Sequence, residues 1–188
     1  MRLAEHKDLK AEIKSLPEKE KDKLLLRLIA KDKVLTEHLH FMLLENEEDL
    51  ATRYRKLMAI IDDGVKELTD SKKITAKDTL LKMRRLSGTI THHYKVTKDV
   101  MTEIELRIHL LKSIPVDFNE GIFSPMYKFN EKLFVYFVKS TQSMLNKFYN
   151  LHEDIQFDMS PVINSILEKI YAHKTAQIAQ ELNLPKEI

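Results

Sequence analysis

The chain has 188 residues and a formal net charge of +2, with 43% hydrophobic and 32% charged residues, the composition of an ordinary globular protein with a sizeable core. It contains no cysteine, which excludes disulfides, a thiolate nucleophile and a cysteine-ligated zinc. Its longest apolar run, residues 133–138, is far shorter than the roughly 20 residues of a membrane span. Because the charged N-terminal segment also lacks the apolar stretch of a signal peptide, we expect a cytoplasmic protein with no membrane partner.

The first segment, residues 1–46, is expected to form short N-terminal helices that make a helical hairpin region. The chain has only three glycines, and its apolar residues recur every three to four positions, so the sequence predicts an all-α fold. Pro17 suits the first turn of a helix, because its missing N–H would be unpaired there. Asp32 is placed to cap the helix that follows.

Residues 47–112 are expected to form long basic helices. Residues 51–112 carry 14 basic and 8 acidic side chains, which makes the middle third the only part of the chain with a clear electrostatic preference. Thr75 and Asp78 have the spacing of a capping box, with aspartate in place of the usual glutamate. Over residues 83–111 the apolar positions alternate by four and three, which predicts one long central helix.

Residues 113–188 are expected to form aromatic-rich C-terminal helices. Ten of the 14 aromatic residues lie between positions 118 and 157, and three phenylalanines at helical spacing should be buried: Phe134, Phe137 and Phe148. Ser124-Pro125 and Ser160-Pro161 are N-cap and first-turn pairs, so each should begin a helix. Together the segments predict a single domain over 1–188, built as a six- to seven-helix bundle.

Two short stretches carry a resemblance to known proteins. They are Ser15-Leu16-Pro17 followed by Leu24 to Leu28 and Lys31-Asp32-Lys33, and the closing Leu184-Pro185-Lys186-Glu187-Ile188. In this layout the chain resembles a group of small all-helical bacterial proteins without assigned function. The resemblance is clearest over residues 1–45 and the tail. It implies an all-helical fold and supplies no catalytic residue.

Four acidic residues form the sharpest pattern with chemical potential. Glu45 and Glu48 make an E-x-x-E motif, and Glu67 and Asp70 make an E-x-x-D motif. The pair is similar to the signature of the all-α nucleoside triphosphate pyrophosphatases, in which two helices present four carboxylates to Mg²⁺. The resemblance implies Mg²⁺-dependent hydrolysis, in which the metal takes hard oxygen ligands and neutralises phosphate charge.

The spacing of the two acidic motifs limits this alternative. If the chain from 47 to 70 is one continuous helix, Glu48 and Glu67 lie about 28 Å apart and cannot share a metal ion. Convergence requires a reversal of the chain, for which Asp62-Asp63-Gly64 offers a break. Composition alone also explains such a match. We therefore assign no catalytic residue, metal ligand or cofactor, and keep the Mg²⁺ enzyme as an alternative.

A second alternative rests on the basic segment 72–98, which holds eight Lys or Arg residues against one acid, Asp78. On a helical wheel four of its cations cluster opposite the apolar stripe: Lys77, Arg84, Lys95 and Lys98. A contiguous basic face can follow the phosphates of a nucleic acid. A solvated face that meets acidic neighbours is the simpler interpretation, and no zinc-finger or helix-turn-helix pattern accompanies it.

The main functional prediction is a non-catalytic protein–protein interaction or scaffold module. Three tyrosines fall off the main apolar stripe of the C-terminal third and form its candidate surface: Tyr127, Tyr136 and Tyr149. A partly exposed aromatic surface is typical of a site that binds a partner helix or a second copy of the chain. We therefore expect a protein partner or a homodimer. No HExxH or glycine-rich phosphate loop points to an enzyme.

Overall fold

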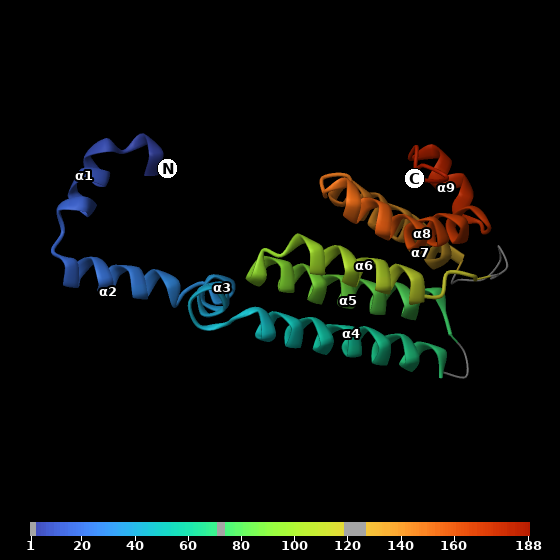
Figure 1. The fold of residues 1–188 in the computed structure, drawn as a ribbon, viewed down its shortest axis with the longest axis horizontal. Coiled ribbons are helices and arrows are strands. Elements are labelled where there is room, and N and C mark those ends of the chain that lie inside the picture. The colour runs from blue at the N-terminus through green and yellow to red at the C-terminus, as the bar shows by residue number, and fades with distance from the viewer. Residues whose placement is uncertain (1–2, 71–73, 119–126) are drawn as a thin grey trace. The chain divides into compact units, whose positions relative to one another are not determined.

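The computed structural model describes residues 3–70, 74–118 and 127–188 (Figure 1). Over these residues the chain forms a short 3-10 helix, η1 (Leu3–Glu5), and nine α-helices. The all-α prediction is confirmed, and the expected count of six to seven helices is wrong. The chain divides into two compact units, Met1–Glu45 and Asn46–Ile188. The single domain expected over 1–188 stays a prediction.

The first unit consists of η1 and three helices: α1 (Lys7–Ser15), α2 (Glu18–Ile29) and α3 (Lys33–Leu44). Asp32 caps α3 as its position predicts, because its carboxylate accepts a hydrogen bond from the Leu35 N–H at 3.1 Å. The Thr36 hydroxyl donates to the Ile29 carbonyl at 3.0 Å and ties α3 to the end of α2. None of the side chains described in this unit is buried.

The second unit begins with three helices that contact one another: α4 (Glu47–Thr69), α5 (Ala76–Thr97) and α6 (Val100–Ser113). The predicted cap of α5 is confirmed, since Thr75 Oγ1 accepts a hydrogen bond from the Asp78 N–H. α4 is continuous through Asp62-Asp63-Gly64. A Cβ added at Gly64 would lie 3.2 Å from a methyl carbon of Leu86, so this glycine permits the close approach of α4 to α5.

The prediction of one long helix over 83–111 is wrong, because the chain turns back between α5 and α6. Lys98 has a left-handed conformation, with φ of 60°, and ends α5. Asp99 then caps α6, accepting hydrogen bonds from the N–H groups of Met101 and Thr102 at 2.9 and 3.2 Å. The apolar residues keep the same spacing on both sides of the turn, because α5 and α6 each bury an apolar stripe.

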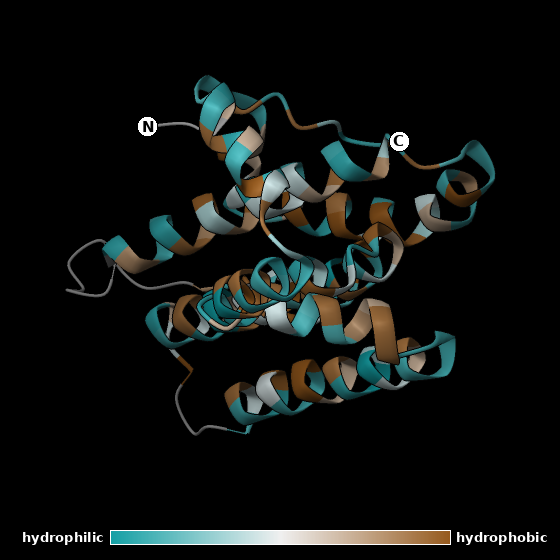
Figure 2. Ribbon diagram, turned by 90° about the vertical axis from the view of Figure 1, so that its left-hand side faces the viewer, coloured by the Kyte–Doolittle hydropathy of each residue, from teal (hydrophilic) through white to brown (hydrophobic). Residues whose placement is uncertain are grey.

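Three further helices complete this unit: α7 (Tyr127–Phe148), α8 (Glu153–Tyr171) and α9 (Thr175–Glu181). α7 packs on α5 and α6, α8 packs on α6, and α9 packs on α7 and α8. Phe134, Phe137 and Phe148 are buried, as their spacing predicts. Figure 2 shows hydrophobic and hydrophilic residues alternating along the helices, as in helices that bury one face. None of the described helices has the length and apolar content needed to cross a membrane.

The helix start expected at Ser160-Pro161 is wrong. α8 begins at Glu153 and carries Pro161 in its interior. Proline has no N–H, so the carbonyl one turn earlier, at Phe157, loses its helical donor. Phe157 is 80% exposed, and the kink-prone turn therefore lies at the surface, where water can supply the hydrogen bond. The other expected start, Ser124-Pro125, lies outside the described residues.

A buried ion cluster joins α5, α6 and α7. Glu103 is fully buried, and one carboxylate oxygen accepts hydrogen bonds from Arg107 Nε and Nη2 at 2.9 and 2.8 Å. Lys147 Nζ donates to the other oxygen, and Arg107 Nη2 also donates to the Thr91 hydroxyl at 3.1 Å. Both carboxylate oxygens are thus satisfied, which a buried charge requires.

Candidate functional site

A groove of about 510 Å³ lies between α5 and α7. We call it the α5–α7 groove and define it by its lining residues. α5 contributes Lys77, Leu80, Leu81 and Arg84; α7 contributes Lys128, Phe129, Glu131, Lys132, Val135, Tyr136 and Lys139. Spacings of three and four place most of each set on one face of its helix. The groove is therefore built by two helix faces that meet along their length.

Two cation–ring contacts join the helices and fix their register. Lys77 Nζ lies 5.7 Å from the centroid of the Phe129 ring, and the guanidinium carbon of Arg84 lies 5.3 Å from that of Tyr136. The two pairs occur in the same order along both helices, so α5 and α7 run parallel. A cation over a ring face is attracted by about 0.5–1 kcal/mol at an exposed site. The rings therefore help to hold these cations at the groove.

The groove concentrates positive charge. It is lined by five Lys or Arg side chains and one carboxylate, Glu131. Within the described parts of the chain, no carboxylate forms an ion pair with any of the five. By contrast, Lys82 on the same helix pairs with Glu67, and its hydrogen bond lowers the pKa of that carboxyl. The described residues thus leave the groove cations without ionic neutralisation.

Apolar side chains form the floor between the cations. Leu80 is buried, whereas Leu81 is 54% exposed, and Val135 is partly buried. Covering exposed apolar surface such as that of Leu81 is favourable, at about 25 cal/mol per Å². An apolar floor with a basic rim is chemically complementary to a segment that is apolar on one face and acidic on the other.

The structure separates the four basic residues of the nucleic-acid alternative. Lys77 and Arg84 line the α5–α7 groove. Lys95 lies in the last turn of α5 and Lys98 occupies its left-handed end. Both are exposed, and neither lines the groove. Only the first half of the predicted basic face therefore belongs to this site.

The three candidate tyrosines also divide. Tyr136 lies in the groove beside Arg84. Tyr149, just after α7, is 50% exposed and its ring centroid lies 5.6 Å from that of Phe148. The side chain of Tyr127 is outside the described residues. The groove thus joins one residue of the aromatic candidate surface to two residues of the basic candidate surface.

The acidic motifs of the enzyme alternative do not meet in α4. Glu48 lies in its first turn and Glu67 near its end, so about 28 Å of continuous helix separates them, and they cannot bind the same Mg²⁺ ion. Asp70 is the C-cap of α4, and Glu45 is the C-cap of α3 in the first unit. Across the described ranges, no group of three His, Asp or Glu side chains is arranged to hold a metal ion.

Half of the groove was not anticipated from the sequence. Lys128, Lys132 and Lys139 recur at spacings of four and seven, which is a basic stripe on one face of α7. The signal is visible on a helical wheel. The net charge of residues 113–188, with 7 basic and 9 acidic side chains, does not reveal this basic stripe. The sequence also does not mark Phe129 as a site residue, because the helical spacing of the aromatic residues points to the buried phenylalanines.

A smaller cleft of about 300 Å³ lies between α4, α6 and α8. Burial raises the pKa of both the Glu105 carboxyl and the Tyr54 hydroxyl, and the two side chains interact. One turn beyond Glu105, His109 hydrogen-bonds to Asp62 at 2.6 Å. These four polar groups already have partners, so the cleft offers a ligand less unsatisfied charge than the α5–α7 groove does.

Comparison of the chain with protein-family models, with curated proteins and with solved structures gives no match. Its function is therefore inferred from the geometry and charge of its own residues.

Proposed function

We propose that this protein is a non-catalytic interaction module whose α5–α7 groove binds an acidic amphipathic helix of a partner protein. One observation carries the proposal. Five cations, none ion-paired to a carboxylate within the described chain, surround two aromatic rings and an apolar floor. A surface with unneutralised charge around apolar residues is complementary to a ligand of opposite charge that also has an apolar face.

The groove has the dimensions of a short helix. On α7 its cations extend from Lys128 to Lys139, which is about 16 Å of helix axis, or three turns of a docked helix. Apolar partner residues spaced by three and four would cover Leu81 and Val135. Asp and Glu on the flanks of that stripe would meet the lysines of both rims.

The basic rim and the apolar floor of the groove should contribute differently to binding. Surface charges speed encounter and are screened over about 10 Å at 0.1 M salt, so their contribution falls as salt rises. Burial of the apolar floor is not screened by salt. Binding should therefore weaken with salt and still persist at high salt.

Single-stranded nucleic acid is the competing polyanion. Proteins bind it by stacking bases on aromatic faces along a basic track. Here Lys77 and Arg84 lie over the rings of Phe129 and Tyr136, and the basic track does not continue to Lys95 along the groove. Both observations favour a protein helix over a nucleic-acid strand.

The test is fluorescence anisotropy with three labelled probes. They are an amphipathic peptide of about 18 residues with a leucine stripe flanked by glutamates, the same composition scrambled, and a single-stranded oligothymidine of similar charge. We expect the amphipathic peptide to bind most tightly. Lys77→Glu with Arg84→Glu should weaken its binding at least about tenfold, as expected when close charge pairs are lost.

The matched control is the pair Lys95→Glu with Lys98→Glu, which changes the net charge equally outside the groove. It should alter the affinity for the amphipathic peptide less than about twofold at physiological salt, because distant surface charges are screened. Equal losses in the two double variants, equal binding of the scrambled peptide, or tighter binding of the oligothymidine would each contradict the proposal. The last result would favour a nucleic-acid function.

A further inference from the structure

The helices of the first unit have no core of their own. α1, α2 and α3 contain 9, 12 and 12 residues, and none of the side chains described in this unit is buried. Isolated helices shorter than about 12–15 residues are only marginally stable in water, because most helical stability in proteins comes from packing an apolar face. These helices therefore require a surface that covers them.

Two apolar stripes are available for this packing, and each lies within about 100° on a helical wheel. We call them the N-terminal stripes: on α2 Leu24, Leu25 and Leu28, and on α3 Leu35, Met42 and Leu43. These residues are between 36% and 72% exposed. At roughly 100 Å² for each side chain, two copies that cover each other's stripes would bury about 1,200 Å² in total, the lower limit for stable protein interfaces.

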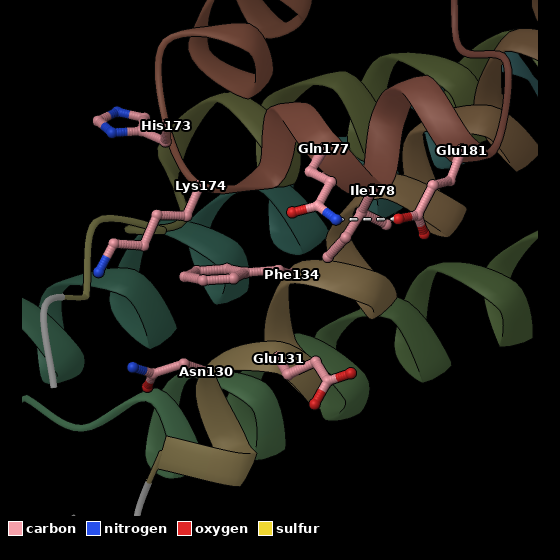
Figure 3. Close-up of a pocket in the computed structure, with 8 residues that line it drawn as sticks. All are labelled: Asn130, Glu131, Phe134, His173, Lys174, Gln177, Ile178 and Glu181. Carbon is pink, nitrogen blue, oxygen red and sulfur yellow. Dashed lines mark hydrogen bonds between the residues drawn. The ribbon is translucent and has the colours of Figure 1, made fainter. Parts of the chain in front are cut away.

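The described surface of the second unit has no comparable apolar stripe. Its exposed large hydrophobic residues are dispersed over several segments: Ile60 in α4, Leu81 in α5, Tyr149 after α7, and Phe157 and Val162 in α8. A hollow of about 570 Å³ between α7 and α9 is mainly polar (Figure 3). Of its eight lining residues only Phe134 and Ile178 are apolar, and the Gln177 amide donates to the Glu181 carboxylate at 3.2 Å. The best apolar match to the N-terminal stripes is therefore a second copy of the same stripes.

The charges beside the stripes also favour a second copy. Residues 18–45 carry six basic and six acidic side chains, so they do not select a strongly acidic or strongly basic partner. Glu20 and Arg27 are seven residues apart, which is about two turns, and lie on the same flank of the α2 stripe. In two antiparallel copies of α2 related by a twofold axis, like flanks meet, so Glu20 of each copy lies beside Arg27 of the other. Glu20 also pairs with Lys23 at 3.4 Å, but both side chains are exposed and such a pair contributes little.

We propose that the first unit is a self-association module that joins two copies of this chain. The α2 stripe packs antiparallel on α2 of the second copy, and the α3 stripes are covered in the same interface. Glu20 and Arg27 form reciprocal ion pairs at its two edges. The pairing does not involve the α5–α7 groove, and a dimer carries two such grooves.

The experiment is sedimentation velocity of the full chain from about 1 to about 200 µM, a range that detects micromolar dissociation constants. We expect the wild type to dimerise. Arg27→Glu and Glu20→Arg should each raise the dissociation constant at least about tenfold, because like charges then face each other. An equimolar mixture of the two variants should dimerise again, since every acidic flank in the mixed dimer faces a basic one. Lys19→Glu makes the same charge change on the opposite face of α2 and should dimerise like the wild type.

The apolar contact has its own variant, Leu25→Gln with Leu28→Gln. Both leucines are exposed in the single chain, so the variant should keep the wild-type circular dichroism of the monomer and lose the dimer. A wild type that is monomeric at about 200 µM would overturn the proposal, as expected if a different protein covers the stripes. A dimer that persists in all the α2 variants, or a mixture that dimerises no better than its components, would overturn it as well. Peptide binding by the α5–α7 groove is measured separately, and none of these results decides it.

Discussion

The guanidinium carbon of Arg84 on α5 lies 5.3 Å from the centroid of the Tyr136 ring on α7. The contact holds a cation at the rim of the α5–α7 groove, and no carboxylate among the described residues forms an ion pair with it. A partner carboxylate would therefore meet a positioned and uncompensated charge. Because the side chain is already held in place, less conformational entropy is lost when a partner binds.

Replacing the ring should separate binding from folding. Tyr136→Leu keeps an apolar floor and removes the ring that attracts Arg84, so we expect a loss of about 0.5–1 kcal/mol in the free energy of unfolding. Affinity for the acidic amphipathic peptide should fall several-fold. Tyr149→Leu changes a tyrosine outside the groove and is the control. An equal effect of both substitutions on peptide affinity would argue against a specific role of Tyr136.

Thr79 is fully buried in α5, and its hydroxyl has no hydrogen-bond partner among the described residues. Thr79→Val keeps the shape and removes the unsatisfied group, so it should stabilise the protein by about 1 kcal/mol. Thr97 is the matched control, because its hydroxyl donates to the His93 carbonyl at 3.0 Å and accepts from the Asp99 N–H at 3.2 Å. Thr97→Val should destabilise by about 1 kcal/mol in urea unfolding. Shifts in the same direction would refute this assignment.

The buried carboxylate of Glu103 is expected to be essential for stability. Glu103→Gln would leave Arg107 and Lys147 without their shared counter-ion, and breaking a buried ion pair in this way costs about 3–5 kcal/mol. Chemical denaturation of the variant measures this loss. Glu131→Gln, an exposed carboxylate on α7, should change stability by less than about 0.5 kcal/mol. A Glu103→Gln variant as stable as this control would contradict the role of the cluster.

Lys169 should make stability depend on pH in the alkaline range. Its ammonium donates to the carbonyls of Leu111, Lys112 and Ile114 at 3.2, 2.9 and 2.6 Å, and burial lowers its pKa from 10.5 to about 8. Between pH 8 and pH 10.5 the Lys169 amine therefore holds its proton more tightly in the unfolded chain than in the folded one. The contribution of Lys169 to the free energy of unfolding thus rises with pH across this range.

The comparison with Lys169→Met isolates this titration, because the variant keeps every other ionisable group. The free energy of unfolding of the wild type should increase relative to that of the variant between pH 8 and pH 10. Parallel pH profiles over this range would mean that the pKa of Lys169 is the same in the folded and unfolded chains.

Local features of the fold could be predicted from the sequence. Helix caps depend on neighbouring residues, and Asp32 and Thr75 occupy the positions that their sequence contexts indicate. The turn at Lys98 could not be predicted in the same way. A left-handed lysine carries no sequence signal such as glycine provides, and apolar spacing is identical in one long helix and in two antiparallel helices that bury the same stripe.

The candidate site could be predicted only in part, for a physical reason. Lys77 and Arg84 share one helix face, which periodicity reveals, but their neighbours Phe129 and Tyr136 belong to a helix far along the chain. Which helix faces pack together is decided by tertiary packing. The sequence therefore predicts the basic and aromatic surfaces as separate features, although Lys77, Arg84 and Tyr136 lie in one groove.

The most direct test of the interaction account is the ¹H–¹⁵N spectrum of the labelled full chain, titrated with the acidic amphipathic peptide. We expect the largest shifts within residues 77–84 and 128–139, which contain the residues that line the α5–α7 groove. The amides of residues 92–98 should change little. Shifts concentrated on residues 92–98 or on α1 to α3, or none at saturating peptide, would contradict the claim that this groove is the binding site.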